Sequence, residues 1–121
     1  MKFLCVVFID EKKLEALPGG EALALDDASV NHDQILRKSG HLLAAQALES
    51  VKTAATVKVR NGKAMVTDGP FAETREQIGG FLLIEARDRA EAIELAKAVP
   101  VAGYGVIEVR PVRELVASGK S

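Results

Sequence analysis

Two segments of this sequence are apolar on both faces of an extended chain, and they limit the possible folds more than any other feature. Residues 3–9 read FLCVVFI and residues 81–86 read FLLIEA, so apolar side chains occupy odd and even positions alike. A strand with no water-tolerant face lies in the middle of a sheet and is covered on both sides. A sheet with such strands therefore needs a cover on each of its two faces.

The first candidate cover is a helix predicted over residues 21–39, where apolar and small residues recur at three- and four-residue steps. The helix ends before Gly40, a residue type that favours the left-handed position after a helix. Asp26 and Asp27 offer a later start as alternative N-caps. The predicted inward stripe consists of Ala22, Leu25, Ser29, His32 and Leu36.

The second candidate cover is a helix that begins after Asp88. Asp88 and Glu91 have the spacing of a capping box, and Pro100 stops the helix. Its predicted buried stripe consists of Ala92, Leu95, Ala96 and Val99. Two helices of this size cover only one face of a sheet.

A β-hairpin is predicted between these helical segments. Residues 53–60 alternate between apolar and polar side chains, and Asn-Gly at 61–62 is the preferred two-residue hairpin turn. With that turn, side chains directly opposite one another share a face. The predicted opposite pairs are Val59 with Ala64 and Val57 with Val66.

The order of elements predicts the fold class. Further strands are expected at 41–48 and 106–110, residues 10–20 are read as a connector, and the 121 residues form one domain. This order predicts an α+β, ferredoxin-like sandwich in which two helices cover one face of an antiparallel sheet. The second face then needs another cover, and the simplest one is a second copy packed sheet to sheet in a symmetric homodimer.

Composition excludes several functions. With 16 basic and 17 acidic residues, the chain has no charge excess that favours nucleic acid or an anionic membrane. The single Cys5 permits no internal disulfide and is read as an inert core thiol. Neither metal-ligand spacing nor a phosphate or dinucleotide fingerprint is present, so no metal and no cofactor are expected. The short apolar start ends in two acids without a cleavage site, which predicts a cytoplasmic protein without a signal peptide or membrane span.

The most distinctive stretch is TDGPFAETREQIGGF at residues 67–81. Asp68 and the following Gly-Pro predict a stiff turn, which Phe71 is expected to anchor by burying its ring. Thr74 and Gln77 have the spacing for one helical turn at 74–77. The loop predicted over 67–80 is longer than an ordinary connection, and such loops are often functional.

This stretch closely resembles the signature of the DGPF family of YCII-related proteins, and the resemblance extends over nearly the whole chain. It includes the strand at 3–9, the segment AATVKVR at 54–60 and the final VIEVRP at 106–111. The resemblance implies a dimeric α/β-barrel fold, in agreement with the homodimer expected from the strand faces.

The resemblance also implies an activity and a partner. YCII-like proteins are suspected enzymes because of a His–Asp pair in a cleft, and the wider superfamily includes isomerases and monooxygenases that need no cofactor. DGPF members are often linked with extracytoplasmic-function sigma factors. Carried over to this chain, the pair is His32 and Asp68.

The chemistry of each candidate residue has a structural alternative. Histidine can accept or donate a proton near neutral pH, and a carboxylate on its second nitrogen fixes the tautomer, but His32 can equally be a helix residue bonded to a carbonyl. Asp68 can be a turn residue that accepts backbone N–H bonds. Arg75 is a candidate anion clamp or a solvated loop charge. Phe71 and Phe81 line a substrate pocket or pack in the core.

Two functions therefore stay open at the level of sequence. One is a small-molecule enzyme that acts on a carbonyl or ring compound, with His32 as general acid or base, Asp68 orienting it and Arg75 holding an anion. The other is a non-catalytic dimer that binds a ligand or a protein partner in sigma-factor-type transcriptional control. The distance from the His32 imidazole to Asp68 distinguishes them.

Overall fold

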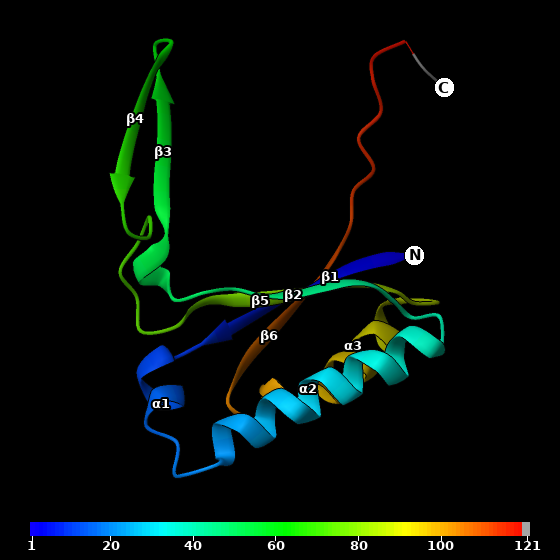
Figure 1. The fold of residues 1–121 in the computed structure, drawn as a ribbon. Coiled ribbons are helices and arrows are strands. Elements are labelled where there is room, and N and C mark those ends of the chain that lie inside the picture. The colour runs from blue at the N-terminus through cyan, green and yellow to red at the C-terminus, as the bar shows by residue number, and fades with distance from the viewer. Residues whose placement is uncertain (120–121) are drawn as a thin grey trace.

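A four-stranded antiparallel sheet with the order β2-β5-β1-β6 forms the centre of the molecule. The computed structural model describes residues 1–119 (Figure 1). The strands of this sheet are β1 (Lys2–Ile9), β2 (Leu42–Ala47), β5 (Gln77–Glu85) and β6 (Gly105–Pro111). The two central strands, β1 and β5, are those whose sequences are apolar on both faces, so this expectation is confirmed.

The two longer helices, α2 (Glu21–Lys38) and α3 (Arg89–Lys97), lie against one face of this sheet (Figure 1). Together with the strand order, this arrangement confirms the predicted ferredoxin-like α+β fold. The described chain also contains a short helix, α1 (Glu11–Glu15), and two single 3₁₀ turns, η1 (Val51–Thr53) and η2 (Pro100–Gly103).

The hydrophobic core lies between the two helices and the sheet. Phe3 on β1 stands opposite Ile84 on β5, and each side chain is only 1% exposed. Cys5 is buried beside them, and burial raises the pKa of its thiol to about 11, as an inert core cysteine requires. The complete core comprises Phe3, Cys5, Val7, Leu36, Leu42, Leu82, Ile84, Ala86, Ala92, Ala96 and Val99.

Helix α2 begins after Gly20, whose φ of 80° places it in the left-handed region. The later start at Asp26 or Asp27 is therefore wrong, because both residues lie inside the helix. Its end agrees with the sequence: Gly40 has φ of 83°, and the His41 amide donates to the Leu36 carbonyl at 3.1 Å. The inward stripe is confirmed from Leu25 to Leu36, whereas Ala22 is exposed.

Helix α3 has the predicted cap. The Glu91 amide donates to Asp88 Oδ1 at 2.9 Å, and Glu91 Oε1 accepts from the Arg87 amide at 2.8 Å. Three members of its predicted stripe are buried and the fourth, Leu95, packs against the core.

The segment 10–20, expected to be a connector without regular structure, contains the short helix α1. Asp10 caps α1 by accepting from the Lys13 amide at 3.3 Å. Glu11 then reaches the segment after β2, where its carboxylate accepts from Ser50 Oγ at 2.7 Å and from the Val51 amide at 2.9 Å. These bonds lower the pKa of Glu11. The short length of α1 gave no periodicity to detect.

The hairpin forms with the predicted register but stands apart from the four-stranded sheet. Strands β3 (Ala55–Arg60) and β4 (Lys63–Asp68) make a separate two-stranded sheet, joined by Asn61 and Gly62 at positive φ. Val59 pairs with Ala64 and Val57 with Val66, as expected. The hairpin projects from the side of the main sheet opposite the helices (Figure 1).

Within residues 1–119, no helix covers the face of the main sheet that is turned away from α2 and α3. Alternate residues on β1 are buried toward the helices, whereas those between them are only half-buried. Because residues directly opposite in adjacent strands share a face, Val6 lies beside Phe81 on one side and Glu108 on the other. We call this surface the open face; its apolar members are Leu4, Val6, Phe8, Ala44, Ile78, Phe81, Leu83 and Val106.

Candidate functional site

The loop between β4 and β5 covers residues 69–76 and is shorter than the loop expected over 67–80. Thr67 and Asp68 still pair with β3, and residues 77–80 already belong to β5. Gly69 opens the loop with φ of 97°. Its amide donates to the Ala54 carbonyl at 2.7 Å and its carbonyl accepts from Thr56 Oγ1 at 2.8 Å, so the start of the loop is fixed to β3.

The expected helical turn at 74–77 is absent. Thr74 Oγ1 instead donates to the Glu76 carbonyl at 2.6 Å, and Gln77 Nε2 donates to the Ala72 carbonyl at 2.8 Å. Side-chain bonds to the backbone of this kind compete with helix formation. The loop is therefore held in shape by its own polar side chains.

The predicted loop residues are exposed. The Phe71 ring is 79% exposed, with the Lys58 ammonium 5.4 Å from its centroid, so the expected buried anchor is wrong for a single chain. Asp68 and Arg75 are also exposed, and neither side chain makes a hydrogen bond or ion pair with residues 1–119. Phe81 is half-buried on the open face. Neither of the two hollows described below is lined by any of these residues.

His32 lies on the inward side of α2, as predicted, with a side chain that is 15% exposed. Its Nδ1 is buried and has no hydrogen-bond partner, which is unusual because buried polar atoms are nearly always bonded. The nearest acid is Asp33, whose Oδ1 is 3.7 Å from Nδ1. Within residues 1–119, no carbonyl accepts a hydrogen bond from Nδ1, so the structural alternative of a carbonyl-bonded histidine is not seen at this nitrogen.

One chain does not bring His32 and Asp68 together. Helix α2 covers one face of the main sheet, and β4 belongs to the hairpin that projects from the other (Figure 1). The pairing remains a prediction that a single chain does not test, since a partner subunit would add further surfaces.

The second histidine has a structural role at the end of β5. His41 Nδ1 is 2.8 Å from the Glu85 carbonyl. Nearby, the terminal ammonium of Met1 donates to the Ala86 carbonyl at 3.0 Å and lies 3.5 Å from Glu85 Oε2. A shallow hollow of about 310 Å³ lies here, and its polar groups already bind one another.

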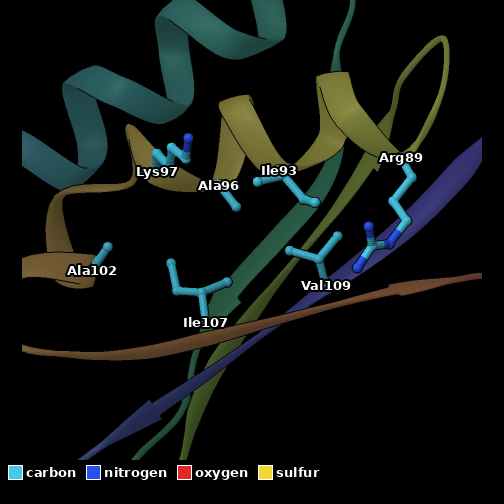
Figure 2. A pocket seen from close by; sticks show the side chains of 7 residues that line it. All are labelled: Arg89, Ile93, Ala96, Lys97, Ala102, Ile107 and Val109. Atoms are coloured by element: carbon cyan, nitrogen blue, oxygen red, sulfur yellow. The ribbon is translucent and has the colours of Figure 1, made fainter.

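A larger hollow of about 370 Å³ lies between α3 and β6 (Figure 2). It was missed in the sequence because its residues come from distant segments and its volume arises from small side chains. Helix α3 and η2 contribute alanines where larger residues would fill the space. The lining residues are Arg89, Ile93, Ala96, Lys97, Ala102, Ile107 and Val109.

Within residues 1–119, no three or more His, Cys, Asp or Glu side chains gather in a way that could hold a metal ion. No helix in that described part has the length and apolar character to cross a bilayer.

Comparison with known proteins gives three findings. The model of the YCII-related domain matches residues 1–116. An uncharacterized protein, R00369, from Rhizobium meliloti (strain 1021) is 40% identical over 76 residues, which cover 61% of this chain and 61% of the relative. The structure of a 5-chloro-2-hydroxyhydroquinone dehydrochlorinase from Burkholderia phenoliruptrix AC1100, in complex with 2,5-dihydroxybenzoquinone, matches with a TM-score of 0.55 and 16% identity. That match covers 93% of this chain and 94% of the dehydrochlorinase chain, and it supports the fold.

Proposed function

The chain belongs to the YCII-related domain family, and from that premise we propose that it binds a small organic molecule as a homodimer formed sheet to sheet. The observation that supports the proposal is the open face, an apolar sheet surface without a cover in one chain. The loop at 69–76 and the hairpin lie at the end of this surface (Figure 1). A second copy on the open face would enclose the space next to the loop.

The chemistry of the open face favours a second copy over solvent. Its centre is apolar around Val6 and Phe81, and its charged groups lie at the margins. Arg110 and Glu108 on the outer strand are 3.9 Å apart, and Lys2 stands opposite Glu85 at one end of the two central strands. Full burial of a Val, Leu or Phe side chain contributes about 1.5–3 kcal/mol. Several such side chains from each copy would give a stable association with twofold symmetry.

The residues around the loop define the class of ligand. Arg75 offers a planar fork of donors for an anionic oxygen, and Asp68 offers an acceptor for a hydroxyl. Phe71 and Phe81 supply aromatic surface for a flat ring. A ring compound with ionised or hydroxyl oxygens fits this set. The likeness to a fold that holds 2,5-dihydroxybenzoquinone makes that compound a reasonable first probe.

An enzymatic form of the proposal assigns proton transfer to His32. Its buried, unbonded Nδ1 is available to a substrate or to a carboxylate. Asp68 is the orienting acid that the family resemblance suggests, and Asp33 is the acid nearest to the ring within one chain. The reaction would be acid–base chemistry on a small carbonyl or ring compound without a cofactor.

The association is tested by sedimentation at micromolar concentration. We expect a dimer for the wild type and a monomer for Val6→Glu, because the new carboxylate lies at the centre of the interface. Val30→Glu is the matched control, since Val30 is 59% exposed on α2 and should leave the dimer unchanged. Circular dichroism checks that both variants fold. A monomeric wild type, or a dimer untouched by Val6→Glu, would refute the sheet-to-sheet arrangement.

Ligand binding is tested by calorimetric titration with 2,5-dihydroxybenzoquinone. Arg75→Gln should weaken binding about tenfold, in line with the loss of a charge-assisted hydrogen bond. The control is Arg37→Gln on the exposed surface of α2. If both variants bind the compound with the same affinity, Arg75 and the loop are not part of the binding site.

Turnover is tested separately with His32→Gln, Asp68→Asn and Asp33→Asn on small quinones and hydroxylated ring compounds. Loss of rate in His32→Gln and in one aspartate variant would identify the acid–base pair. Binding without turnover in the wild type would favour the alternative, a non-catalytic ligand-binding or partner-binding protein in sigma-factor-type control. The exposed apolar side chains of the hairpin are the surface that such a partner would use.

A further inference from the structure

The groove between α3 and β6 is a cavity with an apolar floor and small walls (Figure 2). Ile93 on α3 faces Ile107 and Val109 on β6, while Ala96 and Ala102 leave the space between helix and strand unfilled. Its volume of about 370 Å³ falls within the range of ordinary small-molecule sites. The groove is lined by residues on the helix side of the sheet, away from the open face.

Two cations line the groove, and Arg89 is the one that has no partner among the residues the structure describes. Figure 2 shows its guanidinium reaching from the start of α3 toward Val109, at one end of the groove. Within residues 1–119 it makes no ion pair and donates no side-chain hydrogen bond. Its neighbour Arg87, by contrast, pairs with Glu91 Oε2 at 3.0 Å and lies 3.6 Å from Asp88 Oδ2.

Lys97 lies at the other end of the groove, where its ammonium is already paired with Glu94. Its ammonium lies 2.8 Å from Glu94 Oε1, and Figure 2 shows it turned away from the groove. No acidic side chain lines the cavity. The groove therefore combines a continuous apolar floor with one available positive charge at one end.

We propose that this groove is a second small-molecule site, which takes an organic carboxylate with a short apolar body. The carboxylate would bind the Arg89 guanidinium through two parallel N–H···O bonds, the geometry that this side chain favours. The apolar body would lie over Ile93 and Ile107. A neutral molecule of the same shape would gain the apolar contact alone and bind more weakly.

This site is independent of the proposed dimer. The open face and the loop at 69–76 lie on the opposite side of the sheet from α3 (Figure 1). A second copy on the open face would leave the groove accessible, so each chain would bind one carboxylate in the dimer or in the monomer.

The test uses 3-phenylpropionate and its neutral analogue 3-phenylpropanamide, titrated by calorimetry and by amide chemical shifts. We expect the wild type to bind the carboxylate at least tenfold more tightly than the amide, with shifts centred on residues of α3 and β6. Arg89→Gln should abolish that preference. Arg87→Gln is the matched control and should preserve it, because Arg87 is turned to Glu91.

A second variant tests the apolar floor. Ala102→Leu puts a larger side chain into a half-buried wall position and should weaken both probes at least tenfold while α3 keeps its fold. Unchanged carboxylate affinity in Arg89→Gln, or no binding by the wild type, would overturn the proposal. Binding abolished by Arg75→Gln but not by Arg89→Gln would also overturn it, and would assign the carboxylate to the loop instead.

Discussion

The four-stranded sheet and the two-stranded hairpin differ both in the sequence pattern of their strands and in their surroundings. Both are antiparallel, but the central strands of the sheet are apolar on both faces, whereas strand β3 of the hairpin alternates apolar and polar residues. In the sheet, helices cover one face, and Phe3 is 1% exposed. In the hairpin no helix or strand of the described chain covers either face, and Val57 and Val66 are 62% and 65% exposed.

The hairpin and the sheet are stabilised by different interactions. The hairpin obtains its register from the Asn61–Gly62 turn, and the bonds of Gly69 with Ala54 and Thr56 hold its two strands together at the open end. Because isolated two-stranded hairpins are only marginally stable in water, the stability of this hairpin depends on these local bonds. The sheet derives its stability from buried apolar area. Substitutions of the same type should therefore have unequal effects in the two regions.

The largest contrast is expected between two phenylalanines. Phe3→Ala removes a fully buried ring and should lower the free energy of unfolding by about 3–5 kcal/mol. Phe71→Ala, in the loop beside the hairpin, should change it by less than about 0.5 kcal/mol, since the ring is exposed. Urea unfolding of dilute protein measures both. An equally large loss for Phe71→Ala would show that the loop is buried in the native assembly, which would break the contrast.

Two glycines give the next contrast. A Cβ on Gly80 would lie 2.7 Å from the Gln46 carbonyl oxygen, so Gly80→Ala must displace β2. This substitution should lower the free energy of unfolding by roughly 2–3 kcal/mol. Gly62→Ala meets no neighbour within 4 Å, and its cost of about 1–2 kcal/mol comes only from its positive φ. Urea unfolding should detect the first. Hydrogen exchange of hairpin amides should detect the second, with the main sheet unchanged.

The same contrast explains what the sequence could predict. The hairpin register and the cap at Asp88 follow from near neighbours, so local patterns predict them correctly. The placement of the hairpin outside the main sheet depends on what packs against it, which alternation does not encode. The end of the loop was misplaced for a related reason, because the pairing of residues 77–80 with β1 and β2 extends β5 through two glycines.

The candidate site shows the same limit. The inward position of His32 follows from helical spacing, and the structure agrees. The distance from His32 to Asp68 depends on which side of the sheet each element occupies. It also depends on how a partner subunit packs, and the sequence pattern of one chain does not encode either. The groove beside Arg89 is formed by segments that are far apart in the sequence, and no sequence motif indicates it. An unpaired arginine at a helix start is too common a feature to have indicated it.

A smaller effect is expected at the contact that joins the sheet to the segment leading into the hairpin. Glu11→Gln removes one acceptor for the Val51 amide and should cost about 0.5–1 kcal/mol, a low value because the contact is near solvent. The folded state lowers the pKa of Glu11, so this contribution is present above the unfolded pKa and is lost as pH falls through the folded pKa.

Urea unfolding of wild type and Glu11→Gln between pH 7 and pH 3 measures this contribution. The two curves should differ at neutral pH and converge in acid. Glu15→Gln, at the other end of α1, is the control and should follow the wild type. A difference that grows as pH falls would contradict the assigned direction of the shift.

The smallest effect is expected where the hairpin touches the loop. Lys58→Gln removes the ammonium that lies 5.4 Å from the Phe71 ring and should cost about 0.5 kcal/mol, the magnitude of an exposed cation–π contact. A double-mutant cycle with Phe71→Leu isolates this energy, read from hydrogen exchange of the hairpin amides. Lys63→Gln at the hairpin tip changes the same charge without the ring and should show no coupling. Coupling far above 0.5 kcal/mol would mean that water is excluded from the contact, and therefore that the hairpin is covered in solution as the sheet is.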